Sequence, residues 1–261
     1  MERLTAKSND RIKAAVSVRD SAKVRREQHL FFLEGARLCG DAAENGAGIL
    51  RAFFTPAALE KYTAQTEKII AVSKENYLIT GELAAKLSDT QNPQGVFCVC
   101  RENEKTADAD KILPGGKYIL LENVQDPSNL GAVCRTAEAL GIDGMFVCGG
   151  CDIYNPKALR ASMGSALRLN IMACDDAVEL IGKLNGNGIA TLASTPRADS
   201  TVITGIDMSG GVCCVVGNEG NGITPETMAA CSCRVTIPMR GRAESLNAST
   251  AAAILIWEMM R

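Results

Sequence analysis

The sequence has a single histidine, few aromatic residues and almost no net charge, and each shortage argues against a particular kind of binding site. Of its 261 residues one is histidine and 4% are aromatic, and the formal net charge is −2. So few histidines leave a zinc site short of ligands. So few aromatic side chains argue against an extended stacking platform for single-stranded nucleic acid. The near-zero charge does not by itself suggest a polyanionic partner.

Long hydrophobic runs are also missing. No stretch of about 18 apolar residues occurs, which excludes a membrane-spanning helix. The charged N-terminal residues are not followed by an apolar core, so we expect no secretory signal. With 46% apolar residues, the chain is expected to be a folded, soluble, cytoplasmic protein of one or two domains.

The 11 cysteines are expected to be reduced thiols, because a secreted chain with an odd number would leave one unpaired. Several lie inside apolar runs, where cysteine behaves as a small hydrophobic residue. Cys148 and Cys151 have the spacing of a redox or zinc pair, but there is no second CxxC and only His29 as a further ligand. We therefore expect no metal, and a redox pair is the alternative.

Hydrophobic patterning divides the chain into a small α/β domain at 1–100, a charged linker at 101–116 and a second α/β domain at 117–261. Apolar strands separated by helices predict a parallel sheet covered on both faces. The expected strands are 29–33, 49–55, 68–73, 95–100, 118–122, 144–148, 170–173, 189–193, 212–217 and 234–237. The expected helices are 35–44, 81–87, 130–140, 176–184, 225–230 and 246–261, the last apolar enough to be buried on all sides.

Three segments follow strands of the predicted parallel sheet, at the edge where ligands collect. They read NLGAVCRTA at 129–137, GNEGNG at 217–222, and IPM at 237–239 followed by SLNAS at 245–249. Each has a plain structural interpretation: a helical arginine, a tight turn and a helix cap. The glycine segment is neither a dinucleotide GxGxxG nor a phosphate-binding P-loop.

Taken together, in this order and spacing, the three segments resemble the signature motifs of the SpoU/TrmH family. Its members are S-adenosylmethionine-dependent RNA ribose 2′-O-methyltransferases of the SPOUT superfamily. The segment at 161–167 is similar to a further family segment. Residues 1–100 resemble more loosely the substrate-binding extension of many members, and FFLEG at 31–35 is the nearest match.

The resemblance implies a fold that composition does not show: an α/β domain with a parallel sheet, whose C-terminal segment passes through a loop to make a deep trefoil knot. Such knots are rare among proteins. In the family the knot forms the pocket for S-adenosylmethionine, and the enzymes are homodimers. We expect both properties of this chain.

The resemblance also implies roles for individual residues. Arg135 would act on the ribose 2′-hydroxyl. Arginine stays protonated far above neutral pH, so we prefer electrostatic stabilisation to a role as base, and both remain open. The remaining catalytic residues implied are Asn129, Glu219, Ser245 and Asn247. The implied cofactor-binding residues are Val216, Gly217, Ile237, Met239 and Leu246.

The first 26 residues carry eight lysines and arginines against three acids. In an RNA enzyme such a basic leading helix is expected to contact phosphates, although a solvated helix face is the alternative. Structured RNA recognised by shape suits the small number of aromatic residues. The expected RNA-binding residues are Arg11, Lys13, Lys23, Arg25 and Arg26.

We therefore predict an enzyme that methylates ribosomal RNA, with transfer RNA as the alternative substrate. A non-catalytic RNA-binding factor on the same scaffold is a rival. A nicotinamide-dependent oxidoreductase is a weaker one, because the chain lacks an early GxGxxG followed by an acidic residue.

Overall fold

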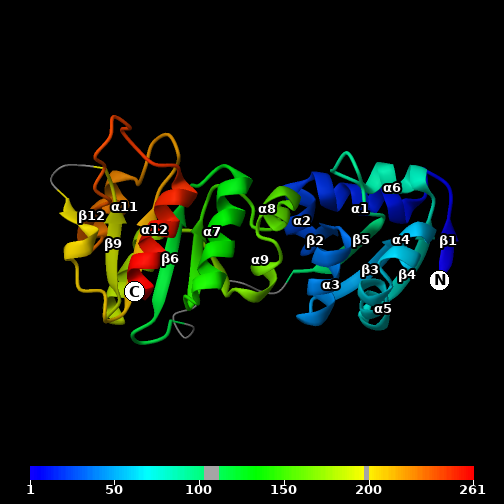
Figure 1. Ribbon diagram of the computed structural model, residues 1–261, viewed down its shortest axis with the longest axis horizontal. Helices are drawn as coiled ribbons and strands as arrows, with labels where there is room; N and C mark the ends of the chain where they lie inside the picture. The colour runs from blue at the N-terminus through cyan, green and yellow to red at the C-terminus, as the bar shows by residue number, and fades with distance from the viewer. Residues whose placement is uncertain (103–111, 197–199) are drawn as a thin grey trace. The chain divides into compact units, whose positions relative to one another are not determined.

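The computed structural model describes residues 1–102, 112–196 and 200–261 (Figure 1). They divide into two compact units, the first formed by residues up to 102 together with Tyr154–Leu167, and the second by the rest. Most of the predicted linker at 101–116 lies outside the described residues. No helix in the described ranges has the length and apolar character needed to cross a membrane.

A mixed sheet forms the first unit. Its strands are β1 (Glu2–Leu4), β2 (Leu30–Glu34), β3 (Gly48–Phe54), β4 (Glu75–Ile79) and β5 (Val96–Arg101). Its helices are α1 (Asp10–Asp20), α2 (Ala22–Gln28), α3 (Ala36–Glu44), α4 (Pro56–Lys61), α5 (Thr63–Val72), α6 (Gly81–Leu87) and α8 (Pro156–Ala161). The strand order is β1-β4-β3-β5-β2, and β5 runs antiparallel to both of its neighbours. Phe32, Phe53 and Phe97 lie in its core.

Side-chain caps begin several helices of this unit. The side chains of Asn9, Thr55 and Thr80 accept backbone N–H groups at the starts of α1, α4 and α6. The strand predicted at 68–73 is wrong, because these residues lie in α5 and the strand follows as β4. A short apolar run does not distinguish a strand from a buried helix turn.

A parallel sheet forms the second unit. Its strands are β6 (Lys117–Glu122), β7 (Gly144–Cys148), β8 (Ile171–Cys174), β9 (Ala190–Ser194), β10 (Thr201–Val202), β11 (Val212–Val216) and β12 (Cys233–Thr236). Its helices are α7 (Pro127–Leu140), α10 (Ala177–Gly186), α11 (Pro225–Ala230), α12 (Ala248–Met260) and the 3-10 turn η2 (Ile203–Gly205). The order is β10-β12-β9-β11-β6-β7-β8, and every pairing is parallel. This confirms the predicted α/β fold.

Burial explains why these strands are so apolar. All five residues of β11 are buried, as expected of a strand covered on both faces. Helix α7 begins where the Asp126 side chain accepts the Ser128 N–H, directly before Pro127. It ends at Gly141, whose φ of 76° suits glycine. Both ends of the motif-bearing helix are therefore set by local sequence.

Helix α12 is buried on one side only, which corrects the expectation that it is buried all round. Leu255 and Ile256 are buried and the helix packs beside α7 (Figure 1). On the other side Ile254, Trp257 and Met260 are 36%, 60% and 41% exposed. An exposed apolar stripe of this kind is a candidate for a contact with another chain.

The segment Tyr154–Leu167 lies with the first unit, although it falls inside the range 117–261 predicted for the second domain. The ring of Tyr154 stacks on Phe31 of β2 with centroids 4.7 Å apart. Arg160 of α8 donates to Asp89 at 2.6 Å. The short helix α9 (Ser165–Arg168) spans the boundary back to the second unit.

Candidate functional site

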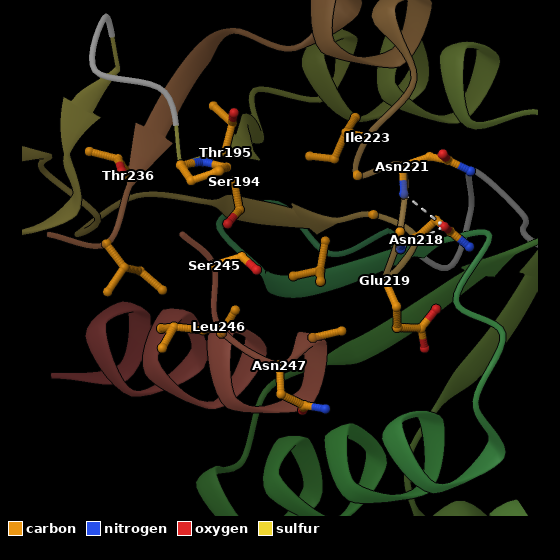
Figure 2. A pocket seen from close by; sticks show the side chains of 18 of the residues that line it. Ser194, Thr195, Asn218, Glu219, Asn221, Ile223, Thr236, Ser245, Leu246 and Asn247 are labelled. Carbon is orange, nitrogen blue, oxygen red and sulfur yellow. Dashed lines mark hydrogen bonds between the residues drawn. The ribbon is translucent and has the colours of Figure 1, made fainter. Parts of the chain in front are cut away.

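A cavity of about 560 Å³ opens at the carboxyl ends of β9, β11 and β12, beside the start of α12 (Figure 2). Ligands collect at this edge of a parallel sheet, and the volume is typical of small-molecule sites. All five residues predicted to bind the cofactor line the cavity: Val216, Gly217, Ile237, Met239 and Leu246.

The glycine segment after β11 forms one wall as a tight hairpin. Asn218 and Gly222 exchange two backbone hydrogen bonds of 3.0 and 2.9 Å, and Gly222 has a φ of +70°. A Cβ at Gly217 would come within 2.2 Å of the Gly222 carbonyl carbon. The resemblance implies that Gly217 binds the cofactor, and a family glycine at such a position is expected to leave room for the ligand. In the structure that room is taken up by the hairpin's own backbone.

The segment 238–246, which links β12 to α12, forms another wall. Among the described residues we find no hydrogen-bond partner for its backbone or side chains. Most of this segment is exposed, so its main-chain N–H groups are accessible to water or to a ligand. Together with the apolar side chains of Met239 and Leu246, this segment fits an amphipathic ligand with several acceptors, such as a nucleoside cofactor.

A chain of hydrogen bonds joins the three motifs beside the cavity. The Glu219 carboxylate accepts from the backbone N–H of Gln125 at 3.0 Å, from that of Asp126 at 3.1 Å and from Asn129 Nδ2 at 2.9 Å. Asn129 Oδ1 in turn accepts from Asn247 Nδ2 at 3.0 Å. Asn247 Oδ1 caps α12 by accepting the Ser249 N–H at 2.9 Å. Thus Asn129, Glu219 and Asn247 form one connected cluster.

The electrostatics of Glu219 follow from these bonds. Partial burial raises the pKa of Glu219, but the N–H groups of Gln125 and Asp126 and the amide of Asn129 outweigh it and lower the pKa below its ordinary value. Glu219 is therefore an ionised acceptor that orders its neighbours at neutral pH.

The other two predicted catalytic residues differ in position. Ser245 lines the cavity (Figure 2). Arg135 is exposed on α7, about 1.7 turns beyond Asn129, and is absent from the cavity wall. We find no ion pair between Arg135 and any described acidic residue. The structure leaves its guanidinium accessible to solvent.

The five predicted RNA-binding residues do not share one environment. Arg25 is only 3% exposed, and its Nη1 donates to the carbonyl oxygens of Val18 at 2.9 Å and Arg19 at 2.7 Å. This burial removes Arg25 from the residues available to RNA, which corrects the prediction.

The remaining basic residues lie on the surface with local contacts. The guanidinium of Arg11 lies 5.1 Å from the Tyr77 ring centroid. Lys13 pairs with Asp10 at 3.2 Å, and Lys23 pairs with Glu27 at 3.8 Å. Arg26 is exposed. Exposed pairs of this kind are weak and exchange readily for phosphate.

Sequence reasoning missed other residues of the cavity. Ser194 and Thr195 line it at the end of β9, where the Thr195 N–H donates to the Val235 carbonyl at 2.9 Å (Figure 2). Their position directly after a predicted strand was the available signal, but no motif marks them. Within the described ranges we find no group of three or more acidic, histidine or cysteine side chains arranged to hold a metal ion.

Comparison with known families agrees with this geometry. Residues 116–257 match the model of the SpoU rRNA methylase family, and residues 9–98 match the MRM3-like substrate binding domain. The first match covers more than half of the chain.

Individual relatives extend over nearly all of the chain. An uncharacterized tRNA/rRNA methyltransferase of Synechocystis sp. is 32% identical over 92% of this chain and 86% of its own length. The 23S rRNA (guanosine(2553)-2′-O)-methyltransferase of Bacillus subtilis is 27% identical over 99% of each chain. The crystal structure of an AdoMet-bound rRNA methyltransferase from Sinorhizobium meliloti has a TM-score of 0.88 at 26% identity, covering 99% and 97% of the two chains.

These matches confirm the resemblance inferred from the three motifs. The chain belongs to the SpoU rRNA methylase family and is an RNA methyltransferase that uses S-adenosylmethionine.

Proposed function

We propose that this protein methylates a ribose 2′-hydroxyl in structured ribosomal RNA. The observation that carries the proposal is the cluster of Asn129, Glu219 and Asn247 beside a cavity lined by all five expected cofactor-binding residues. The Bacillus subtilis relative, a 23S rRNA 2′-O-methyltransferase by name, supports the substrate class.

In this proposal the apolar side chains of Val216, Ile237, Met239 and Leu246 hold S-adenosylmethionine, and the N–H groups of the segment 238–246 donate to its polar atoms. Gly217 contributes backbone to the wall. When bound, the cofactor supplies a methyl group activated by a positively charged sulfur. The protein's task is to hold the ribose oxygen in line with that methyl and to manage one proton.

Arg135 carries the chemistry at the ribose. Its guanidinium stabilises negative charge on the 2′-oxygen as the proton passes to water or to a neighbouring group, and it orients the neighbouring phosphate. A role as general base is the alternative, which its permanent charge disfavours. Asn129 and Glu219 hold the ribose and the start of α7 in place, and Ser245 and Asn247 complete the polar wall.

We assign RNA binding to residues 1–100, methyl transfer to residues 117–261 and a linker to 101–116. The match of residues 9–98 to a substrate binding domain supports the first assignment. The exposed side chains of Arg11, Lys13, Lys23 and Arg26 contact phosphates, since a polyanion attracts them more strongly than the weak local partners of the first three do.

We propose a homodimer that buries the exposed stripe of α12. Ile254, Trp257 and Met260 together form an apolar surface on a helix of the catalytic unit. Tryptophan is enriched at the centres of protein interfaces because it buries a large area at little entropic cost. Such a dimer would keep Trp257 from water.

We further propose that the C-terminal segment is knotted, as the resemblance implies. The hairpin after β11 and the segment before α12 form walls of the same cavity, and α12 packs back on β11 and α7, which agrees with such a path. We place the protein in the cytoplasm, where ribosomal RNA is available as substrate.

The activity is tested by incubating purified protein with tritiated S-adenosylmethionine and ribosomal or transfer RNA transcripts, and by mapping modified sites through primer extension at low nucleotide concentration. We expect incorporation into ribosomal RNA at one 2′-O position. Incorporation into transfer RNA alone would identify the alternative substrate. Cofactor binding without transfer to any RNA would support a non-catalytic factor.

The dimer is tested by sedimentation velocity of Trp257→Glu at about 10 μM, well above the Kd of a stable interface. We expect the wild type to sediment as a dimer and the variant as a monomer. The matched control is Val178→Glu, on α10, where the replaced apolar side chain is 40% exposed but lies off the stripe. A monomeric wild type, or a dimeric Trp257→Glu variant, would contradict the proposal.

A further inference from the structure

The glycine hairpin is attached to the end of β6 at two points. At its start, Asn218 Nδ2 donates to the Asn123 carbonyl at 2.9 Å. At its end, the N–H and hydroxyl of Thr224 donate to the Glu122 carboxylate at 2.9 and 2.8 Å. Glu122 and Asn123 are consecutive in the chain, so the carboxyl end of β6 holds both ends of the hairpin.

The two attachments differ in burial. Glu122 is only 4% exposed and also accepts the Thr227 hydroxyl at 2.6 Å, which ties α11 to the sheet. This is a buried polar cluster of the kind that supports stability. Asn218 is half-buried and lines the cavity, next to Glu219 in the chain.

The side chain of Asn218 makes two separate connections. Its Oδ1 accepts the N–H groups of Gly220 at 2.9 Å and Asn221 at 3.0 Å, which shapes the hairpin itself. Its Nδ2 reaches across to the Asn123 carbonyl, in the loop that begins the first motif. One amide therefore sets the shape of the hairpin and also its distance from that loop.

The acceptor on the other side is held firmly. Asn123 has a φ of 54°, in the left-handed region, and its N–H donates to the Cys148 carbonyl at 2.8 Å. A Cβ on Gly149 would lie 2.4 Å from Asn123 Oδ1, and one on Gly150 would lie 2.3 Å from the Val124 carbonyl. The two glycines after β7 thus allow the loop after β6 to pack closely. If the bond between Asn218 and the Asn123 carbonyl is lost, we therefore expect the hairpin to move and not the loop after β6.

We propose that Asn218 is a positioning residue for methyl transfer, acting through Glu219. Its Nδ2 bond holds the hairpin so that the neighbouring Glu219 carboxylate meets the N–H groups of Gln125 and Asp126 and the amide of Asn129. Losing the bond lets the carboxylate drift and loosens the start of α7. The inference rests on the proposed function for its effect on catalysis, and on the hydrogen bonds alone for its effect on the loop.

Asn218→Asp isolates the contact between the two loops. Aspartate keeps an acceptor for the Gly220 and Asn221 N–H groups, but has no donor for the Asn123 carbonyl and repels it. We expect kcat to fall about tenfold, while the Kd for S-adenosylmethionine, measured by calorimetry, changes less than threefold. Asn218→Ala, which also loses the hairpin bonds, should weaken cofactor binding as well.

The matched control is Asn187→Asp, the same change at an exposed residue whose Nδ2 donates to the Lys183 carbonyl at 2.8 Å. Asn187 lies before β9, at the amino edge of the sheet, away from the cavity. It should leave kcat, cofactor affinity and the exchange rates below unchanged.

A second readout does not depend on activity. Amide hydrogen exchange of Gln125 and Asp126, whose N–H groups are bonded to Glu219, should be at least about fivefold faster in Asn218→Asp than in the wild type. If the wild type transfers no methyl group, the proposed function fails while the exchange result still decides the positioning role. Unchanged exchange in Asn218→Asp, or wild-type kcat in an active enzyme, would overturn the inference.

Discussion

The polar motif residues of the second unit and the lysines of the first unit have different kinds of hydrogen-bond and ion-pair partners. In the second unit Glu219, Asn129 and Asn247 come from three distant segments and meet in one hydrogen-bonded cluster. In the first unit Lys13 and Lys23 pair within their own helices, with Asp10 and Glu27. The function of the motif residues therefore depends on their meeting in the folded structure. The function of the basic residues depends on which of them stay exposed.

Sheet topology explains why the motif residues of the second unit meet. All strands of the second unit are parallel, so their carboxyl ends meet at one edge and the loops that follow lie together. In the first unit β1, β2, β3 and β4 run in one direction and β5 runs against them, so most of its strand ends also share one edge. The shared edge of the parallel sheet is what brings the three motifs of the second unit within hydrogen-bonding distance.

The largest expected effect comes from Arg135→Ala. Without the guanidinium, methyl transfer should fall about 10³-fold, because charge on the ribose oxygen loses its stabilising partner. Cofactor affinity should stay within threefold of the wild type, since Arg135 is absent from the cavity wall. Tritium incorporation and calorimetry measure the two quantities. Arg135→Lys sharpens the result, because it keeps the charge and removes the planar fork. Wild-type activity in Arg135→Ala would contradict the catalytic assignment.

Glu219→Gln breaks the cluster itself. A neutral amide cannot accept from Gln125, Asp126 and Asn129 as the carboxylate does, so we expect kcat to fall about 10²-fold. Steady-state methyl transfer measures this. Glu179→Gln, at an exposed carboxylate of α10, is the control and should match the wild type.

The same residue predicts a pH dependence. Because hydrogen bonds lower the pKa of Glu219 in the folded protein, their stabilisation is present above the unfolded carboxyl pKa and is lost as pH falls through the folded value. Glu219 should therefore impose no acid limb on the rate between about pH 5 and pH 8. A Glu219-dependent decline within that range, absent from the Glu219→Gln profile, would contradict the lowered pKa.

In the first unit the expected effects are smaller and depend on salt. We replace Arg11, Lys13, Lys23 and Arg26 together by alanine. The slope of log K for RNA binding against log salt concentration should become less negative by up to about 3. Filter binding at several salt concentrations measures it. Point variants are needed because Ile12, Ala15 and Val18 of α1 lie in the core.

Arg25→Ala sharpens this test. It should leave the salt slope unchanged but lower the free energy of unfolding by about 1–3 kcal/mol, because buried carbonyl oxygens lose their donor. A flattened slope in Arg25→Ala would return that residue to the RNA contacts.

Much of the catalytic unit could be predicted, because its information is local. Buried strands such as Val212–Val216 can be predicted from their apolar composition. The motifs predict residues that line the cavity. Three features of the protein depend on tertiary packing and could not be predicted. The left-handed Asn123, the burial of Arg25 and the exposure of Trp257 depend on which elements pack against them.

Errors in the first unit have the same origin. The apolar run at 68–73 is equally compatible with a strand and with one side of a helix, and only packing against the sheet decides for α5. In the second unit, the resemblance implies a cofactor-binding role for Gly217, and the structure adds a constraint that the sequence does not show. The constraint is the close approach of Gly222, which requires the folded hairpin.

The stacking of Tyr154 on Phe31 has a consequence for synthesis on the ribosome. The first unit needs Tyr154–Leu167 to be complete, yet this segment is translated only after β6 and β7 have emerged. Domains usually fold in the order in which they are made. Here the ring of Phe31 gains its partner Tyr154 only after β6 and β7 have been translated, so the last contacts of the amino-terminal unit form once synthesis of the second unit has begun.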